Sequence, residues 1–416
     1  MTYTYLRKHS YGDQAKYNAE VEARVNNPLG VKLPFEIHPF FREQKQFDKT
    51  FQLFYLPTKE ISFLREKLYE NSKEIVNLLH SLPPIAQKKV FINNLLEEIK
   101  ATNDIEGVQS TRKEISEAIE EAEKNITNNK RFNGLVKLYM KFRDSEYSDI
   151  KNVEDIRKIY DILLDDEIEK KNLPDGNLFR NDKVYIEKNG KRVHQGIGNS
   201  GNAEVYIISE LEKLVDFMNK HDVPSLEKCV ASHYYLEYIH PFYDGNGRLG
   251  RFIACSYLSR KLDFLSAISF SSSIKKQKGI YGTAFSETSN PRNHGELTIF
   301  IIEMFGLLVK GQENIIDNLR VGKASFDAIA SYLDTLSLNE IQSSILFILS
   351  QDYLFSNTNN KITDIDLAEV CSVGRKKLNT ALKYLLEEEY IVQTQRNPMA
   401  HKLSDKFINH INNLIS

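Results

Sequence analysis

The run HPFYDGNGRLGR at residues 240–251 constrains this chain of 416 residues more than any other feature. Apolar residues at helical spacing precede it, in 226–236, and follow it, in 249–258. Pro241 and the glycines of the run lie between these patterns, and neither residue type favours a helix interior. We therefore predict a tight loop between two helices, with the C-terminal half of the run at the start of the second helix.

A glycine-rich loop that leads into a helix is a suitable site for phosphate, because the first backbone N–H groups of a helix lack helical partners. Gly245 and Gly247 would let the backbone approach a ligand closely. Arg248 and Arg251 are three residues apart, so they share a helix face and can donate to phosphate oxygens. This half of the run predicts a polyphosphate site.

The other half of the run supplies a carboxylate and a base. Asp244 directly precedes the loop glycines, where it can hold Mg²⁺ that bridges phosphate oxygens. His240 is the residue of the run best suited to accept a proton near neutral pH. Together these groups predict phosphoryl- or nucleotidyl-transfer chemistry.

Two other interpretations of the run are weaker. GNGRLG matches the dinucleotide-binding pattern GxGxxG, but that pattern needs a preceding strand, and here HYYLEYI continues a helix. No GxxxxGK[ST] phosphate loop occurs in the chain. A single histidine is usually a packed or solvated residue, but a histidine, an acid, Asn-Gly and two arginines in one loop are not explained that way.

The run resembles the signature of the Fic family, HxFx[DE]GNGRxxR, at every defined position, and the resemblance extends over roughly residues 150–310. Most characterised relatives transfer AMP from ATP to a hydroxyl of a target protein. The resemblance implies a nucleotidyltransferase, a protein adenylyltransferase that carries out AMPylation with Mg²⁺. His240 would deprotonate the target hydroxyl, Phe242 would pack inward, and Asp244 would coordinate the metal ion. The residues that would bind the nucleotide are Gly245, Asn246, Gly247, Arg248, Leu249, Gly250, Arg251 and Tyr281.

The resemblance also assigns more specific roles. Arg248 would contact the β-phosphate and Arg251 the γ-phosphate. A predicted hairpin within 183–208, with Asn189–Gly190 as its turn, would be the flap that clamps the target segment. Tyr281 would line the base pocket, although many relatives have a second aromatic residue where this chain has Gly282.

An upstream segment matches the inhibitory pattern of the family, [ST]xxxE[GN], with Thr102, Glu106 and Gly107 at the defined positions. A glutamate at the C-terminal end of a helix is disfavoured by the helix dipole, so it needs a cationic partner. We predict that Glu106 pairs with Arg251 and keeps the γ-phosphate from docking. Some relatives use this glutamate to align a water that removes AMP, so de-AMPylation by the same site is an alternative.

The predicted fold is mainly α: a Fic-type helical core with a small β-hairpin flap, an N-terminal helical extension and a C-terminal winged helix-turn-helix. The expected divisions are a mostly helical N-terminal region, 1–100, a Fic domain, 101–330, with its inhibitory helix at 101–107, and a winged helix-turn-helix domain, 335–416. The winged helix-turn-helix is predicted from the order of its elements, which are a helix at 338–349, two helices around a turn, and a hairpin.

The C-terminal segment leaves two partners open. Arg375, Lys376 and Lys377 begin the expected recognition helix, and Arg396, His401 and Lys402 lie on the expected wing; these bases could contact DNA phosphates. Glu387–Glu389 and a net charge of −2 argue against strong attraction to DNA and favour a protein partner. A rival function for the whole chain is therefore a DNA-binding regulator that senses nucleotide and turns over little.

Composition excludes several other classes. The three cysteines are far apart, with no CxxC pair, which favours reduced, buried thiols over a disulfide framework or a zinc site. The first residues lack the apolar core of a signal peptide, and no apolar run approaches membrane-spanning length. We therefore expect a cytoplasmic protein that does not bind membranes. The oligomeric state stays open, although relatives often form homodimers.

Overall fold

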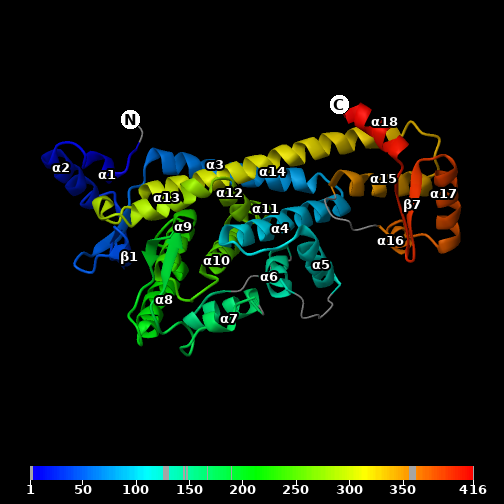
Figure 1. Cartoon of the computed structure of the whole chain (residues 1–416). Coiled ribbons are helices and arrows are strands. Elements are labelled where there is room, and N and C mark those ends of the chain that lie inside the picture. Colours follow the sequence, from blue (N-terminus) through cyan, green and yellow to red (C-terminus); the bar gives the residue numbers. More distant parts are fainter. Residues whose placement is uncertain are drawn as a thin grey trace. The chain divides into compact units, whose positions relative to one another are not determined.

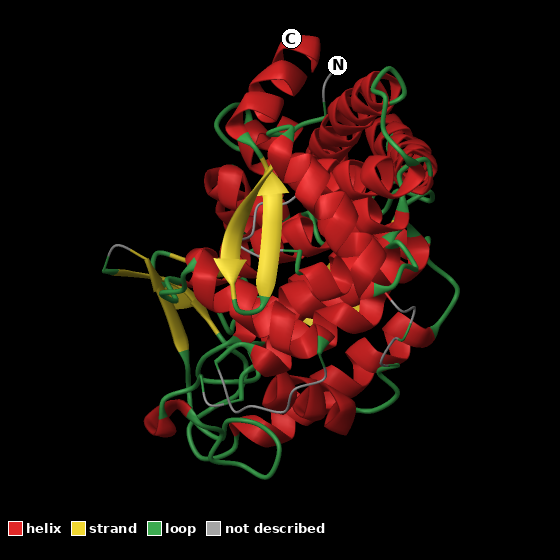
Figure 2. Ribbon diagram, turned by 90° about the vertical axis from the view of Figure 1, so that its right-hand side faces the viewer, coloured by secondary structure: helices red, strands yellow, loops and turns green. Residues whose placement is uncertain are grey.

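The computed structural model describes residues 3–124, 131–143, 146, 149–165, 167–188, 190–355 and 362–415. Helices form most of this structure, and the strands occur as short antiparallel pairs (Figures 1 and 2), which agrees with the predicted mainly α fold. The chain divides into two compact units, which are Met1–Lys73 with Leu96–Glu313, and Glu74–Leu95 with Asn314–Ser416. Among the described helices, none combines the length and apolar character needed to cross a bilayer.

The boundaries between the units fall inside three helices, α3 (Lys59–His80), α4 (Pro84–Glu106) and α14 (Thr298–Leu333). The three segments expected from the sequence stay a prediction. Each of these helices contributes its two ends to different units. Apolar periodicity does not show where along a helix the chain passes from one unit to the other.

The first unit is built mainly from helices. Those that lie wholly within it are α1 (Leu6–His9), α2 (Gln14–Val25), α5 (Arg112–Glu123), α6 (Asn133–Arg143), α7 (Val153–Leu163), η1 (Lys170–Asn172), α8 (Ala203–Asn219), α9 (Ser225–Ile239), α10 (Asn246–Lys261), α11 (Phe264–Ala267), α12 (Phe270–Lys276), α13 (Lys278–Thr288) and η2 (Pro291–Asn293). Two of these, α9 and α10, are buried on almost every side. In α10, every residue from Asn246 to Ser259 is buried, which is the pattern of a helix at the centre of a core.

The strands of the first unit form three pairs. They are β1 (Val31–Ile37) with β4 (Phe51–Tyr55), β2 (Phe40–Phe41) with β3 (Gln44–Lys45), and β5 (Tyr185–Lys188) with β6 (Lys191–Gln195). Alternate residues of β1 are buried because successive side chains of a strand point to opposite faces. The β5–β6 hairpin is the predicted flap, with Tyr185 opposite Gln195. Of its expected turn, Gly190 has a φ of 73°, whereas Asn189 lies outside the described residues.

The second unit contains the C-terminal elements in the predicted order of helix, two helices around a turn, and hairpin. They are α15 (Glu340–Phe355), α16 (Asp364–Val370), α17 (Arg375–Glu387), β7 (Ile391–Arg396), β8 (Met399–Leu403) and α18 (Asp405–Ile415). Its core gathers apolar residues from each of these elements, such as Leu346, Leu367 and Leu385.

One expected DNA contact in this unit is wrong. His401, which we expected on the surface of the hairpin, is only 4% exposed, and its Nδ1 lies 2.8 Å from Oδ1 of Asp364. The imidazole therefore joins β8 to α16 and cannot reach a phosphate. Its neighbour Lys402 is exposed, since adjacent residues of a strand face opposite sides.

Candidate active site

The run at residues 240–251 covers the loop between α9 and α10 and the first residues of α10, as predicted. The loop begins at His240, with a left-handed φ of 55°, and ends at Gly245, with a φ of 82°. A side chain at Gly245 would meet Leu164 at 2.2 Å, so both the space and the backbone require glycine there. No side chain caps the start of α10, which leaves the N–H groups of its first turn for a ligand.

Asn246 closes this loop from within. Its Oδ1 accepts from the backbone N–H of Phe242 at 2.9 Å, and its Nδ2 donates to the carbonyl of the same residue at 2.8 Å. Phe242 itself is fully buried and stacks on Tyr160 with ring centroids 3.6 Å apart. Asn246 and Phe242 therefore hold the shape of the loop.

Arg180 is a buried arginine that the sequence analysis did not identify. Its guanidinium donates to the backbone carbonyls of His240 at 2.8 Å, Ile197 at 2.8 Å and Asp182 at 2.5 Å. Burial lowers the pKa of this guanidinium to about 10, so it stays charged at neutral pH. Because Asp182 and Ile197 flank the flap, one side chain fixes both the flap base and the backbone of His240.

The imidazole of His240 is neutral at physiological pH. Burial, together with the charge of Arg180, lowers its pKa to about 4. Its Nδ1 lies 3.4 Å from the carbonyl oxygen of Glu237. When Nδ1 carries the proton and donates to that carbonyl, Nε2 keeps a free lone pair. The geometry therefore provides a general base that is already unprotonated.

His240 faces a cavity of about 550 Å³, which is large enough for a nucleotide. The cavity lies between the loop, the flap and helix α13. Its described lining residues are Ile105, Glu106, Tyr185, Ile186, Glu187, Lys188, Val193, His194, Tyr234, Glu237, Tyr238, His240, Tyr243, Asp244, Gly245, Asn246, Gly247, Arg251, Lys278, Tyr281, Gly282, Phe285, Ser286 and Ser289.

Arg251 and Glu106 form an ion pair at the edge of this cavity, with Nη2 and Oε1 2.9 Å apart. The arginine side chain is 1% exposed and the glutamate side chain 29%. Thr102 accepts from Arg251 Nε at 2.9 Å through its hydroxyl, and its carbonyl accepts from Nη2 at 3.2 Å. Burial lowers the pKa of Arg251, but the attraction of its neighbours, to which Glu106 contributes most, together outweighs it and holds that pKa above its usual range. The contact expected between these residues is present.

Two lysines hold the last turn of α4 in place. Lys278 donates to the carbonyl of Ile105 at 2.7 Å, and Lys275 pairs with Asp104 at 2.6 Å. Cations at a helix C-terminus are stabilising because the carbonyls there carry partial negative charge. Gly107 follows with a φ of 75° and ends the helix, as predicted. These contacts position the turn that carries Glu106.

Three of the expected nucleotide-binding residues do not line the cavity. Arg248 forms an ion pair with Glu167 at 2.7 Å, in which each side chain is 2% exposed. Leu249 is fully buried, and Gly250 faces the side chain of Glu237. With 3.6 residues per turn, Gly247 and Arg251 share the cavity face of α10, whereas the three residues between them point elsewhere.

Replacing Glu167 by alanine is expected to lower the free energy of unfolding by about 3–5 kcal/mol, because Arg248 would keep a buried, unpaired charge. Denaturant titration of the purified protein measures this change. Glu169→Ala is the matched control, because Glu169 is an exposed glutamate two residues away, and it should leave the unfolding midpoint unchanged. A loss below about 1 kcal/mol for the Glu167 variant would contradict a structural role for the pair.

Asp244 also lines the cavity, and one of its carboxylate oxygens accepts from the N–H of Gly245 at 2.6 Å. Among the residues that the structure describes, no group of three or more His, Cys, Asp or Glu gathers as a metal site. Mg²⁺ needs no such group, since it often binds one or two carboxylates and completes its shell with substrate phosphates and water. A single carboxylate beside the phosphate-binding turn fits this mode.

Tyr281 lies on the wall opposite the loop. Its hydroxyl is 2.8 Å from Nε2 of His233, and burial raises its pKa, so it is a neutral phenol. Gly282 beside it also lines the cavity, and the nearest atom to a side chain added there is Nζ of Lys188, at 3.7 Å. A flap lysine thus lies where a second aromatic residue would stand.

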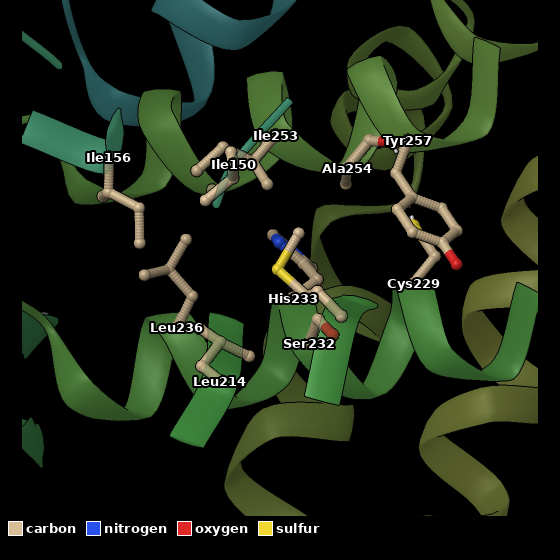
Figure 3. A pocket seen from close by; sticks show the side chains of 12 residues that line it. Ile150, Ile156, Leu214, Cys229, Ser232, His233, Leu236, Ile253, Ala254 and Tyr257 are labelled. Atoms are coloured by element: carbon tan, nitrogen blue, oxygen red, sulfur yellow. Dashed lines mark hydrogen bonds between the residues drawn. The ribbon is translucent and has the colours of Figure 1, made fainter. Parts of the chain in front are cut away.

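A second cavity lies between α8, α9 and α10 and measures only about 10 Å³. Figure 3 shows Ile156, Leu236 and Ile253 pointing into it, with His233 and Ser232 among the residues that line it. A space of this size holds at most one water. It is therefore a small void in the core and not a ligand site.

Comparison with known proteins gives a family match for part of this chain. Residues 150–258 match the model of the Fic/DOC family. No curated protein matches the chain. The matched residues include the flap, helix α9 and the loop with its GNG turn.

Two solved structures resemble this chain. A crystal structure of a Fic family protein from Desulfovibrio desulfuricans G20 has a TM-score of 0.51 and 17% sequence identity, covering 84% of this chain and 98% of that one. Fic-1 from C. elegans has a TM-score of 0.42 and 16% identity, covering 62% of this chain and 73% of that one. The first of these likenesses concerns the fold alone. The run at 240–251 lies within the residues 150–258 that match the Fic/DOC family model.

Proposed function

We propose that this protein transfers AMP from ATP to a Ser, Thr or Tyr hydroxyl of a target protein, and to itself. Members of the Fic family transfer nucleotidyl groups to proteins. The observation that carries the proposal is one cavity in which the neutral imidazole of His240, the open first turn of α10 and the buried guanidinium of Arg251 face the same space. A base, a phosphate site and a fixed cation are what transfer from a nucleoside triphosphate requires.

In the proposed reaction, the target hydroxyl oxygen attacks the α-phosphorus of ATP and forms a new P–O bond. Nε2 of His240 takes the hydroxyl proton. The bond between the α-phosphorus and the oxygen bridging to the β-phosphate breaks, and pyrophosphate leaves with that electron pair. The N–H groups at Gly245, Asn246 and Gly247 would stabilise the negative charge on the phosphates, and Arg251 would hold the γ-phosphate so that pyrophosphate lies in line with the attack.

Asp244 would hold the Mg²⁺ of the metal–nucleotide complex. Bound there, the ion would neutralise part of the charge that builds up on the phosphates. The flap would hold the target: β5 lines the cavity, and among the described residues only β6 pairs with it, so one edge is free for an extended segment.

Glu106 would keep the enzyme inactive by occupying Arg251. The ion pair at 2.9 Å and the two bonds to Thr102 satisfy the guanidinium before a γ-phosphate arrives. A triphosphate would then bind without the contact that orients it, and transfer would be slow.

Labelled ATP tests the proposed reaction directly. The Glu106→Gly variant should incorporate label from α-³²P-ATP into protein and release an equal amount of pyrophosphate, but incorporate none from γ-³²P-ATP. Incorporation from the γ-phosphate would make the protein a kinase instead. If neither label is transferred while ATP binds, the proposal is wrong.

Removal of AMP by the same site is the second candidate, because the carboxylate of Glu106 lines the cavity and is partly exposed, so it could hold a water. Protein labelled by the Glu106→Gly variant is the substrate for this test. Wild-type protein that releases the label as AMP, when Glu106→Gly does not, would support de-AMPylation.

For the C-terminal unit we propose a winged helix-turn-helix that binds DNA phosphates through α17. Exposed Arg375, Lys376 and Lys383 line a shallow surface groove together with Asn379 and Thr380. Gel shifts with random duplex DNA at low salt should detect binding that the double variant Arg375→Glu/Lys376→Glu lacks. No shift with the wild-type protein would favour a protein partner instead.

A further inference from the structure

Glu237 is a carboxyl group of the cavity that the proposed reaction does not use. It lies in the last turn of α9, three residues before His240, and its side chain reaches toward α10. Only the missing side chain of Gly250 makes room for it, since an added Cβ there would lie 2.3 Å from its Oε1. That oxygen is buried and has no hydrogen-bond partner among the described residues. A buried acceptor without a partner is costly for a carboxylate, which favours the protonated form.

Two charged residues on neighbouring helices act on Glu237. Arg251 of α10 attracts its ionised form, and Glu106 of α4 repels it. The remaining titratable neighbours are neutral, because burial lowers the pKa of His233 to about 3 and raises that of Tyr281. His240, on the loop after α9, is neutral as well. Burial raises the pKa of the Glu237 carboxyl to about 8 while Glu106 occupies Arg251.

We propose that Glu237 is a positioning residue of the nucleotide site that acts as a neutral carboxylic acid, and that a polyphosphate ligand binds together with the proton that keeps it neutral. This inference rests on the proposed function, because that function places a triphosphate beside Arg251. Two carboxyl groups, those of Glu106 and Glu237, then face the guanidinium of Arg251. A polyphosphate must displace Glu106, and it binds best when Glu237 is uncharged.

The protonation of Glu237 and the binding of a polyphosphate are linked because both depend on which anion faces Arg251. With Glu106 in place, burial and, to a smaller extent, the negative charge of Glu106 keep Glu237 protonated. When Glu106 is removed and no ligand is bound, Arg251 faces Glu237 alone, and this attraction lowers the pKa of the carboxyl. A bound polyphosphate brings several negative charges and raises that pKa again. Between these two pKa values, binding takes up a proton, so affinity falls as the pH rises.

Calorimetry measures how many protons the protein takes up when ATP binds. ATP is titrated into Glu106→Gly and Glu106→Gly/Glu237→Gln, each in two buffers of different ionisation enthalpy between pH 7 and pH 9. The first variant should take up more protons than the second, by up to about one, and its affinity should fall up to about tenfold more per pH unit. Protons that ATP itself exchanges are the same for both variants and cancel in the difference.

Glutamine matches glutamate in size and cannot ionise, so a purely structural role would change affinity equally at every pH. Equal proton uptake and equal pH slopes for the two variants would overturn the inference, even when Glu106→Gly transfers AMP. A difference in proton uptake without any AMP transfer would uphold the inference and overturn the proposed function. If ATP does not bind to Glu106→Gly at all, both are wrong.

Discussion

Replacing His240 by alanine is expected to slow AMP transfer by about 100- to 10,000-fold, the usual contribution of a positioned general base. The imidazole lines the cavity, and its Nε2 can take a proton when Nδ1 donates to the carbonyl of Glu237. Alanine removes this acceptor without adding bulk, and the phosphate-binding turn and Arg251 stay in place. Transfer of label from α-³²P-ATP, measured in the Glu106→Gly background, gives the rate of each variant.

The low pKa of His240 also predicts how the rate depends on pH. Burial favours the neutral form, so the base loses its activity only as the pH falls toward about 4. From pH 5 to pH 8, the titration of His240 should not change the rate. A control variant, His221→Ala, removes an exposed histidine from the segment before α9 and should leave the rate unchanged. Equal labelling by His240→Ala and its parent, with ATP binding intact, would exclude His240 as the base.

Much of the site could be predicted because its residues are contiguous. The run at 240–251 has the loop and the start of α10 within twelve residues, and helical periodicity on both sides fixes how they connect. The contact of Glu106 with Arg251 could also be predicted from the sequence. A glutamate that ends a helix requires a cation, and the family pattern indicates which one.

The residues that were missed act through partners distant in sequence. Arg180 donates to backbone carbonyls, which carry no residue-type signal, and it lies in a segment with the appearance of an ordinary loop. Glu167 pairs with Arg248 across 81 positions. Glu237 occupies a helix position that periodicity describes only as helical. Tertiary packing decides all three, and a single sequence does not contain that information.

Periodicity also explains why Arg248 was expected to reach the ligand. Arg248 and Arg251 are three residues apart, which places them on neighbouring parts of one helix face. In the structure, Glu167 holds the first of them away from the cavity, whereas the second lines it. Spacing thus showed that both side chains could reach a phosphate, but the neighbouring helices determine which one does.

The Glu106→Gly variant is expected to transfer AMP about 10- to 100-fold faster than the wild type. Charge-assisted hydrogen bonds contribute about 1.5–3 kcal/mol each, and 1.4 kcal/mol corresponds to a factor of ten. Removing Glu106 takes away the anionic partner of Arg251 and keeps its bonds to Thr102, so its charge is free for the γ-phosphate. Because Gly107 already ends α4, a glycine one residue earlier removes little helix.

Charge and backbone effects are separated by Glu106→Gln, which keeps the side-chain length and should also raise transfer, though less than glycine because its amide still fills the same space. Glu97→Gln is the matched control, since Glu97 lies on the same helix and pairs with Arg112 on the surface. It should leave transfer unchanged. Adding Arg251→Ala to Glu106→Gly should abolish the gain, because both variants act on one guanidinium. A Glu106→Gly rate within twofold of the wild type, at saturating ATP, would show that this ion pair does not inhibit the enzyme.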